Sequence, residues 1–282
     1  MRILIILSLL LSFSCSASLV LTKEQTSQIR QDLIEFEGVK REIYIGKLGV
    51  PTLGVGQTLG HRENNKVTLW SLKEINSFFK SAGIRQMSSV TYKELKRLVA
   101  ITNANLKKGK DAPHGLTIKS SKRKYRLSNR EVNKLLDKSI QDTVNDINYD
   151  AERLGIDLEG LPVAAIPGLI DLRYRGKRKL ALSKKTPKIN AAIKQKDMLS
   201  FTKEMYAYSN SNEVWQNDAR NAYYSSHVLA ILSKEDQEAF LKFKNSSKKA
   251  RTVNKRIINL LKQHPGSVTQ EVYASIHKLV TS

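Results

Sequence analysis

The chain has 282 residues, of which 40% are hydrophobic and 26% carry a charge. This composition excludes a disordered or fibrous chain and fits a globular protein of one large or two small domains. Lysine and arginine outnumber aspartate and glutamate by 48 to 26, so the formal net charge is +22. Such a charge attracts polyanions, including nucleic acid, anionic lipid and acidic cell-wall polymers, and it also keeps a protein soluble.

Residues 1–18 predict an export signal. Arg2 precedes an apolar run over residues 3–11, and small residues surround Ala17. The run is too short to span a bilayer, which favours a secretory signal cleaved near Ala17 or Ser18. We therefore expect a mature protein that is periplasmic or secreted.

The single cysteine of the chain, Cys15, lies inside that signal. The mature protein therefore has no thiol for a disulfide or a metal site. Lipid attachment at Cys15 is the weaker alternative, because Ser12 and Phe13 stand where a lipoprotein signal has an aliphatic and a small residue. The five histidines show no paired ligand spacing, so we predict no metal and no cofactor.

The first mature element is predicted to be a helix followed by a small sheet. Thr22 and Gln25 have the spacing of a capping box, and apolar residues at helical intervals predict a helix that ends at Glu37, before Gly38. Residues 40–57 are rich in glycine and β-branched residues, which predicts a β-hairpin or meander. The rest of the chain shows mainly helical patterns.

Two further capping boxes, Thr91 with Glu94 and Ser128 with Glu131, predict helix starts. Between these helices, residues 107–126 form a basic segment rich in turn residues, which we expect on the surface. The fold class is therefore predicted as α+β and mainly helical, with a small sheet near the amino terminus. We predict helices over residues 70–80, 92–106, 128–147, 162–172, 188–193, 199–208, 218–232 and 269–280, with a basic amphipathic region over 234–262.

One ungapped block of sequence resembles a known family. Its matched positions are Glu37-Gly38, Ile43-Tyr44, Gly49, Thr52, Gly54 and Gly56, and they resemble the amino-terminal signature of the phage-type lysozymes of glycoside hydrolase family 24. In these enzymes a glutamate ends the first helix, a β-hairpin follows, and a threonine faces the glutamate across the cleft. Weaker similarity continues in LSNREVNKLLDKSIQDTVNDI, IDLRYRGK and VWQNDARNAYY.

The resemblance implies a lysozyme-like domain over residues 19–232, in which 107–126 is a basic insertion. Residues 233–282 have no counterpart in the family and are expected to form a basic helical extension. The resemblance also implies roles for single residues in a cleft. Glu37 would protonate the glycosidic oxygen and Thr52 would help to hold the attacking water. Tyr44, Gln57 and Arg220 would contact the substrate, although Gln57 stands where the family has a histidine. Arg220 would also lie close to Glu37 and form a salt bridge with it.

Gly46 departs from the family pattern. The family has an aspartate nine residues after the glutamate, as general base, and Gly46 stands at that position here. Inverting hydrolysis needs a second carboxylate to activate water, and losing a general base commonly removes about two to four powers of ten in rate. We regard Glu63 as the best candidate for a relocated base, if residues 61–65 fold back over the cleft. Glu42 and Asp171 are alternatives, although Asp171 is better explained by pairing with an arginine.

Three functions follow from these observations. The favoured one is an exported peptidoglycan hydrolase that cleaves the bond between N-acetylmuramic acid and N-acetylglucosamine, with Glu37 as general acid. The second is a catalytically degenerate wall-binding protein, and the third is a polyanion-binding protein that acts through residues 107–126 and 242–262. We expect a monomer whose partner is peptidoglycan or another anionic wall polymer, with a membrane surface as a weaker candidate and nucleic acid as the weakest.

Overall fold

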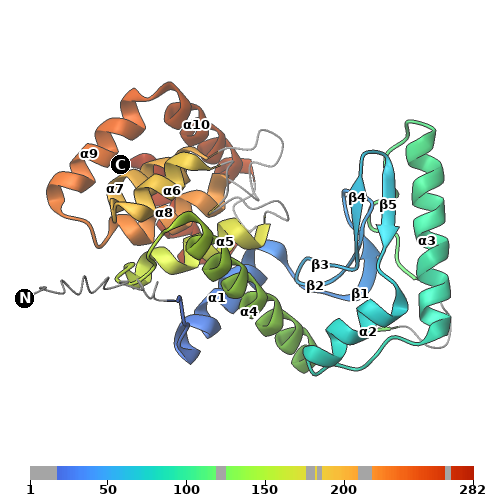
Figure 1. Ribbon diagram of the computed structural model, residues 1–282. Helices are drawn as coiled ribbons and strands as arrows, with labels where there is room; N and C mark the ends of the chain where they lie inside the picture. The colour runs from blue at the N-terminus through green and yellow to red at the C-terminus, as the bar shows by residue number, and fades with distance from the viewer. Residues whose placement is uncertain (1–17, 119–124, 176–181, 183–185, 209–217, 264–267) are drawn as a thin grey trace, which may run out of the picture.

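The computed structural model describes residues 18–118, 125–175, 182, 186–208, 218–263 and 268–282 (Figure 1). These residues are mainly helical and include a small antiparallel sheet near the amino terminus, so the predicted α+β, mainly helical class is confirmed. The predicted export signal, with Cys15, lies almost wholly outside the described residues. No helix among those that are described is both long and apolar enough to cross a membrane.

Helix α1 (Lys23–Glu37) leads directly into a lobe built around the sheet. Its capping box is as predicted, with Thr22 accepting from the Gln25 amide at 3.2 Å. Strand β2 pairs antiparallel with both β1 and β3, while β4 and β5 form a separate hairpin. The elements of this lobe are β1 (Lys40–Ile45), β2 (Pro51–Gly54), β3 (Gln57–Thr58), β4 (Gly60–Glu63), β5 (Lys66–Leu69), α2 (Leu72–Ser81) and α3 (Ser89–Lys107).

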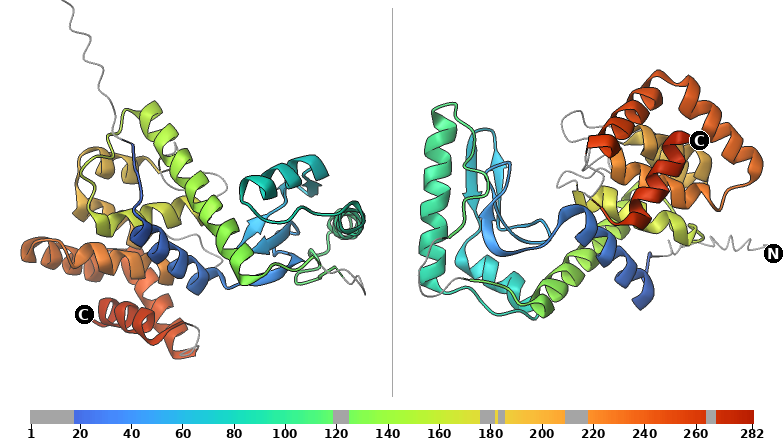
Figure 2. Two further views of the ribbon diagram at one scale, coloured as in Figure 1. Left: turned by 90° about the horizontal axis from the view of Figure 1, so that it is seen from below. Right: turned by 180° about the vertical axis from the view of Figure 1, so that it is seen from behind.

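Helix α4 (Asn129–Leu154) joins the sheet lobe to a helical lobe, as Figures 1 and 2 show. Its 26 residues span about 39 Å at 1.5 Å per residue. The predicted capping box at Ser128 is present, and Gly155 ends the helix in the left-handed conformation, with φ of 59°. The buried stripe of α4 packs closely on the sheet, because a Cβ at Gly54 would lie 3.1 Å from Leu135.

The helical lobe contains the described residues that follow α4 (Figure 2). Pro162 precedes a 3₁₀ turn rather than a helix, and the α-helix predicted there begins at Ile166. The other predicted helices of this lobe lie within a few residues of their expected positions. The elements are η1 (Val163–Ala165), α5 (Ile166–Arg175), α6 (Pro187–Lys194), α7 (Met198–Ala207), α8 (Arg220–Leu229), α9 (Lys234–Ser246), α10 (Lys248–Gln263) and α11 (Gln270–Thr281).

Helices α9 to α11 share the core of the helical lobe. Phe240, Ile257 and Ile276 are fully buried in the same cluster as the side chains of α7 and α8. Lys244 is also buried, where its ammonium donates to the Leu279 carbonyl at 2.9 Å and burial lowers its pKa. Helices α9 to α11 therefore complete this lobe, and their basic side chains belong to the outward faces of amphipathic helices.

Three local predictions differ from the structure. Helix α3 begins at Ser89, three residues before the predicted start at Tyr92, because Ser88 and not Thr91 serves as its cap and accepts from the Thr91 amide at 3.2 Å. Residues 61–65 belong to the β4–β5 hairpin, where Asn64 takes a φ of 51° that asparagine tolerates. Part of segment 107–126 extends the sheet, since the Ile45 amide donates to the Leu116 carbonyl at 2.9 Å.

The shared core predicts that α9 is needed for the stability of the whole helical lobe. Phe240 is 0% exposed and meets the Tyr206 ring edge-on at 5.5 Å between centroids. Phe240→Ala should lower the free energy of unfolding by about 3–5 kcal/mol, measured by urea denaturation. The control Ile231→Ala removes an exposed side chain and should change it by less than about 0.5 kcal/mol. Equal stability of the two variants would contradict the shared core.

Candidate active site

Glu37 is the last residue of α1 and lies where the chain turns from helix into strand. The turn depends on Gly38, which has a φ of 66° and donates its amide to the Ile34 carbonyl at 2.9 Å. The backbone at Gly56 also approaches the carboxylate, because a Cβ there would lie 3.6 Å from Glu37 Oε2. Gly38 of the Glu-Gly pair and Gly56 of the Gly-x-Gly pattern thus each have a local structural reason.

Arg220, at the start of α8, holds one oxygen of this carboxylate. Its guanidinium donates to Glu37 Oε1 at 2.5 Å and, through its other terminal nitrogen, to Asp171 Oδ1. The Arg220 side chain is 0% exposed and its guanidinium lies 5.2 Å from the centroid of the Phe36 ring. The pairing with Glu37 agrees with the position that the family resemblance implied for Arg220.

Asp171 and Arg175 of α5 complete a buried ionic network. Asp171 Oδ2 lies 2.8 Å from Arg175 Nε, and Arg175 donates to the Asn221 side chain at 2.6 Å. Among the described residues, two carboxylates and two guanidiniums make the network neutral, which is the balance that buried charges require. Burial lowers the pKa of Arg175, whereas at Arg220 the charges of Asp171 and Glu37 outweigh burial and raise the pKa.

This network decides the role of Asp171. Both of its oxygens are engaged with arginines, and the side chain is 1% exposed. A carboxylate in this position cannot reach a water in a cleft, so Asp171 is a pairing residue and not a relocated base. The sequence-based expectation that Asp171 pairs with an arginine is confirmed at Arg175.

Thr52 and Gly46 face each other in the β1–β2 hairpin. Thr52 is buried and donates its hydroxyl to the Val50 carbonyl at 3.0 Å. A Cβ at Gly46 would lie 3.0 Å from Thr52 Oγ1 and 3.3 Å from the Val50 carbonyl oxygen. Side chains at position 46 would therefore push against Thr52. The hairpin is packed around a glycine at the place where the family has its aspartate.

Glu63 and Glu42 lie apart from the ionic network. Glu63 is exposed at the end of β4, opposite Lys66, in a hairpin that packs beside α3 (Figure 1). Glu42 lies on β1 and pairs through its backbone with Arg126. Within the described residues, neither carboxylate shares a hydrogen-bond or ion-pair partner with Glu37.

Gln57 and two tyrosines surround the segment that approaches Glu37. Gln57 joins β3 to α4, since its side-chain oxygen accepts from Ser139 at 2.9 Å. Burial and, secondly, the charge of Glu37 raise the pKa of Tyr44 and of Tyr174. The Tyr174 hydroxyl donates to the Val55 carbonyl. Tyr174 was not predicted as a site residue, although it lies in the IDLRYRGK segment that carries part of the resemblance.

Comparison of the chain with protein-family models, with curated proteins and with solved structures gives no match. Over the residues that the structure describes, no three or more histidine, cysteine, aspartate or glutamate side chains gather as ligands for a metal ion. The chemistry of the site is therefore argued from Glu37 and its neighbours.

The neutral network predicts a large effect of removing one carboxylate. Asp171→Asn leaves two buried guanidiniums with one carboxylate, so the free energy of unfolding should fall by about 3–5 kcal/mol in urea denaturation. Asp142→Asn is the matched control, because Asp142 pairs with Lys138 on the surface of α4, and it should cost less than about 1 kcal/mol. An Asp171→Asn protein as stable as its control would contradict the network.

Asp32 marks the contact between α1 and α8 that orients the pair of Glu37 and Arg220. It is 4% exposed, and Oδ1 accepts from Gln28 at 2.9 Å and from the Tyr223 hydroxyl at 3.2 Å. In the described part of the chain its second oxygen has no hydrogen-bond partner. Burial raises the pKa of Asp32 to about 6, against the opposing effect of the two donors.

This raised pKa predicts a stability that falls as the pH rises. Between the ordinary value of 3.8 and about 6 the folded protein binds more protons at Asp32 than the unfolded chain does. Asp32 should therefore cost about 2–3 kcal/mol of folding stability at pH 7 relative to pH 4. Urea denaturation at both pH values should show that Asp32→Asn lacks this loss, whereas the control Asp111→Asn, at an exposed aspartate, retains it. Parallel pH profiles for wild type and Asp32→Asn would refute the assignment.

Proposed function

We propose that the protein is an exported lysozyme-type enzyme that cleaves the bond between N-acetylmuramic acid and N-acetylglucosamine in peptidoglycan, with Glu37 as general acid. The state of the Glu37 carboxyl group carries this proposal. Arg220 holds Oε1, while Oε2 faces Gly56 and has no hydrogen-bond partner in the described part of the chain. The Glu37 side chain is 20% exposed, so one fixed oxygen is within reach of a ligand. General acid catalysis requires a proton on a positioned carboxyl group, and Oε2, the oxygen that Arg220 does not hold, would carry that proton to the substrate.

The surroundings support the same role. Asp171 pairs with the second terminal nitrogen of the Arg220 guanidinium. The positive charge of Arg220 is therefore shared between Asp171 and Glu37. The large positive charge of the protein would concentrate it on an anionic wall. The Glu37-containing block, with Thr52, Gly54 and Gly56, keeps the spacing of the family that it resembles.

The attacking water has weaker support than the acid. Asp171 is sequestered, Glu63 lies on an exposed hairpin, and Thr52 already donates its hydroxyl to Val50. Hydrolysis through Glu37 with a poorly activated water should be about two to four powers of ten slower than hydrolysis with two placed carboxylates. A slow peptidoglycan hydrolase is the expected result.

Gly46 favours a second candidate function, a peptidoglycan- or polyanion-binding protein without turnover. The close contact that a Cβ at position 46 would make with Thr52 and Val50 shows a hairpin packed for glycine. A binding protein derived from an enzyme has no need of the second carboxylate. The exposed lysines and arginines of α10, which lie in the basic segment 242–262, would then provide most of the attraction to the wall.

Zymography on peptidoglycan tests the proposal. Wild type should clear the substrate, and Glu37→Gln should lose at least about two powers of ten of that activity, because the amide cannot donate the proton. Glu24→Gln, an exposed position on the same helix, is the matched control and should keep the activity. Binding of insoluble peptidoglycan by a wild type that clears nothing would instead establish the second candidate. Equal clearing by wild type and Glu37→Gln would refute the role of Glu37.

A further inference from the structure

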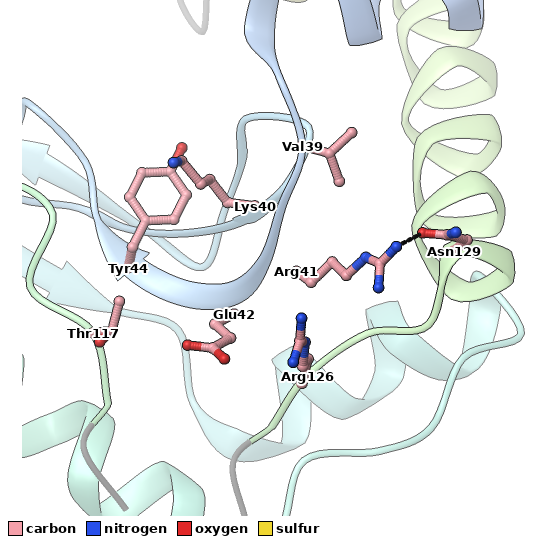
Figure 3. Close-up of a pocket in the computed structure, with 8 residues that line it drawn as sticks. All are labelled: Val39, Lys40, Arg41, Glu42, Tyr44, Thr117, Arg126 and Asn129. Atoms are coloured by element: carbon pink, nitrogen blue, oxygen red, sulfur yellow. Dashed lines mark hydrogen bonds between the residues drawn. The ribbon is translucent and has the colours of Figure 1, made fainter.

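A pocket of about 540 Å³ lies on the outer side of β1, directly after the residue proposed as the acid (Figure 3). The first half of β1 supplies most of its wall, and segments on either side of residues 119–124 supply the rest. Asn129, the first residue of α4, completes the wall of the pocket. The lining residues are Val39, Lys40, Arg41, Glu42, Tyr44, Thr117, Arg126 and Asn129.

An irregularity in β1 explains why so many consecutive side chains reach one pocket. In a regular strand, neighbouring side chains point to opposite faces of the sheet. Here the pairing of β1 with β2 shifts register between Lys40 and Tyr44. A bulge of this kind bends a strand and redirects its side chains, and it is often found beside functional sites.

The pocket contains more positive than negative charge. Lys40, Arg41 and Arg126 give three positive charges against one negative charge from Glu42. Figure 3 shows Arg41 directed to Asn129, to which it donates, and Arg126 close to Glu42. Over the described chain, neither Lys40 nor Arg126 forms an ion pair. Cations held together in this way gain free energy when an anion binds between them.

The single carboxylate in the pocket restricts the anion. Glu42 would repel a doubly charged phosphate, but it would attract an ammonium group placed beside a carboxylate. Arg41 and Arg126 offer the planar donors that match a carboxylate. Val39 and the ring of Tyr44 add surface for an aliphatic chain. The pocket therefore matches the zwitterionic end of an amino acid better than a simple anion.

We propose that this pocket binds the free end of a diamino acid in the peptide that is attached to the glycan, with Arg41 and Arg126 on its carboxylate and Glu42 on its ammonium. The proposal rests on the proposed function, because it assigns the pocket to the same substrate. The position of the pocket supports it, since the lining begins at Val39, two residues after Glu37 in the chain. The enzyme would then prefer glycan strands whose peptides are not cross-linked at this end.

Calorimetric titration of the full chain with two synthetic peptides tests this assignment. Both are L-alanyl-γ-D-glutamyl peptides, one ending in meso-diaminopimelate and the other in lysine, so they differ in the carboxylate at the free end. The diaminopimelate peptide should bind about tenfold or more tightly than the lysine peptide. Equal binding of the two peptides would overturn the proposal, and so would binding of inorganic phosphate as tight as that of the diaminopimelate peptide.

Variants assign the individual contacts. Arg126→Ala and Glu42→Gln should each weaken the diaminopimelate peptide about tenfold, and Arg126→Ala should also remove most of the difference between the two peptides. Arg130→Ala, an exposed neighbour outside the pocket, should leave the binding unchanged. All three positions are at the surface, and circular dichroism should verify that each variant is folded. Unchanged binding by Arg126→Ala would overturn the proposal.

The titration and the zymogram give separable answers. Peptide binding does not require Glu37, so it is expected to persist in Glu37→Gln. If the protein clears peptidoglycan but binds neither peptide, the proposed ligand of the pocket is wrong and the proposed function stands. A protein that binds the diaminopimelate peptide but clears nothing would keep the pocket as a wall-binding site and lose the catalytic role of Glu37.

Discussion

The buried guanidinium of Arg220 is the contact on which the arrangement of the site depends. It joins the end of α1, through Glu37, to α5, through Asp171, and it lies at the start of α8. A buried cation needs compensating charge, so the three helices must meet at this point for the protein to fold. The same requirement fixes one oxygen of Glu37, and in the described part of the chain the other oxygen has no hydrogen-bond partner. Stability and the proposed chemistry therefore depend on one set of ion pairs.

Much of the fold could be predicted from local sequence signals. Capping boxes at Thr22 and Ser128 located α1 and α4, because a cap is a contact between residues three apart. The same logic misplaced the start of α3, where Ser88 and Thr91 compete as caps within one turn. The β4–β5 hairpin was missed because its Asn-Asn turn has the composition of a surface loop. Local patterns fail to predict the structure where one short stretch of sequence fits two different local structures equally well.

Contacts between distant parts of the sequence were harder to predict than the helices and strands. The pairing of Glu37 with Arg220 could be anticipated from the family resemblance, but periodicity alone has no information on contacts over that distance. Asp32 and Tyr174 were missed because nothing near them in sequence distinguishes a buried polar side chain from a surface one. The shared core of α9 to α11 was hidden by a basic composition, since amphipathic helices place their charges outward whether or not they pack on a domain.

The distance along the chain between Glu37 and Arg220 has a consequence for how the protein folds during its synthesis. The two residues are separated by 183 positions, and the Glu35 carboxylate of α1 accepts from the Thr269 amide at the start of α11. A ribosome completes α1 long before it reaches either partner. Contacts of such separation form late, after the entropy of closing a long loop has been lost. A nascent chain therefore contains Glu37 before the partners that position its carboxylate have been synthesised. The site is assembled only once nearly all of the polypeptide has been made.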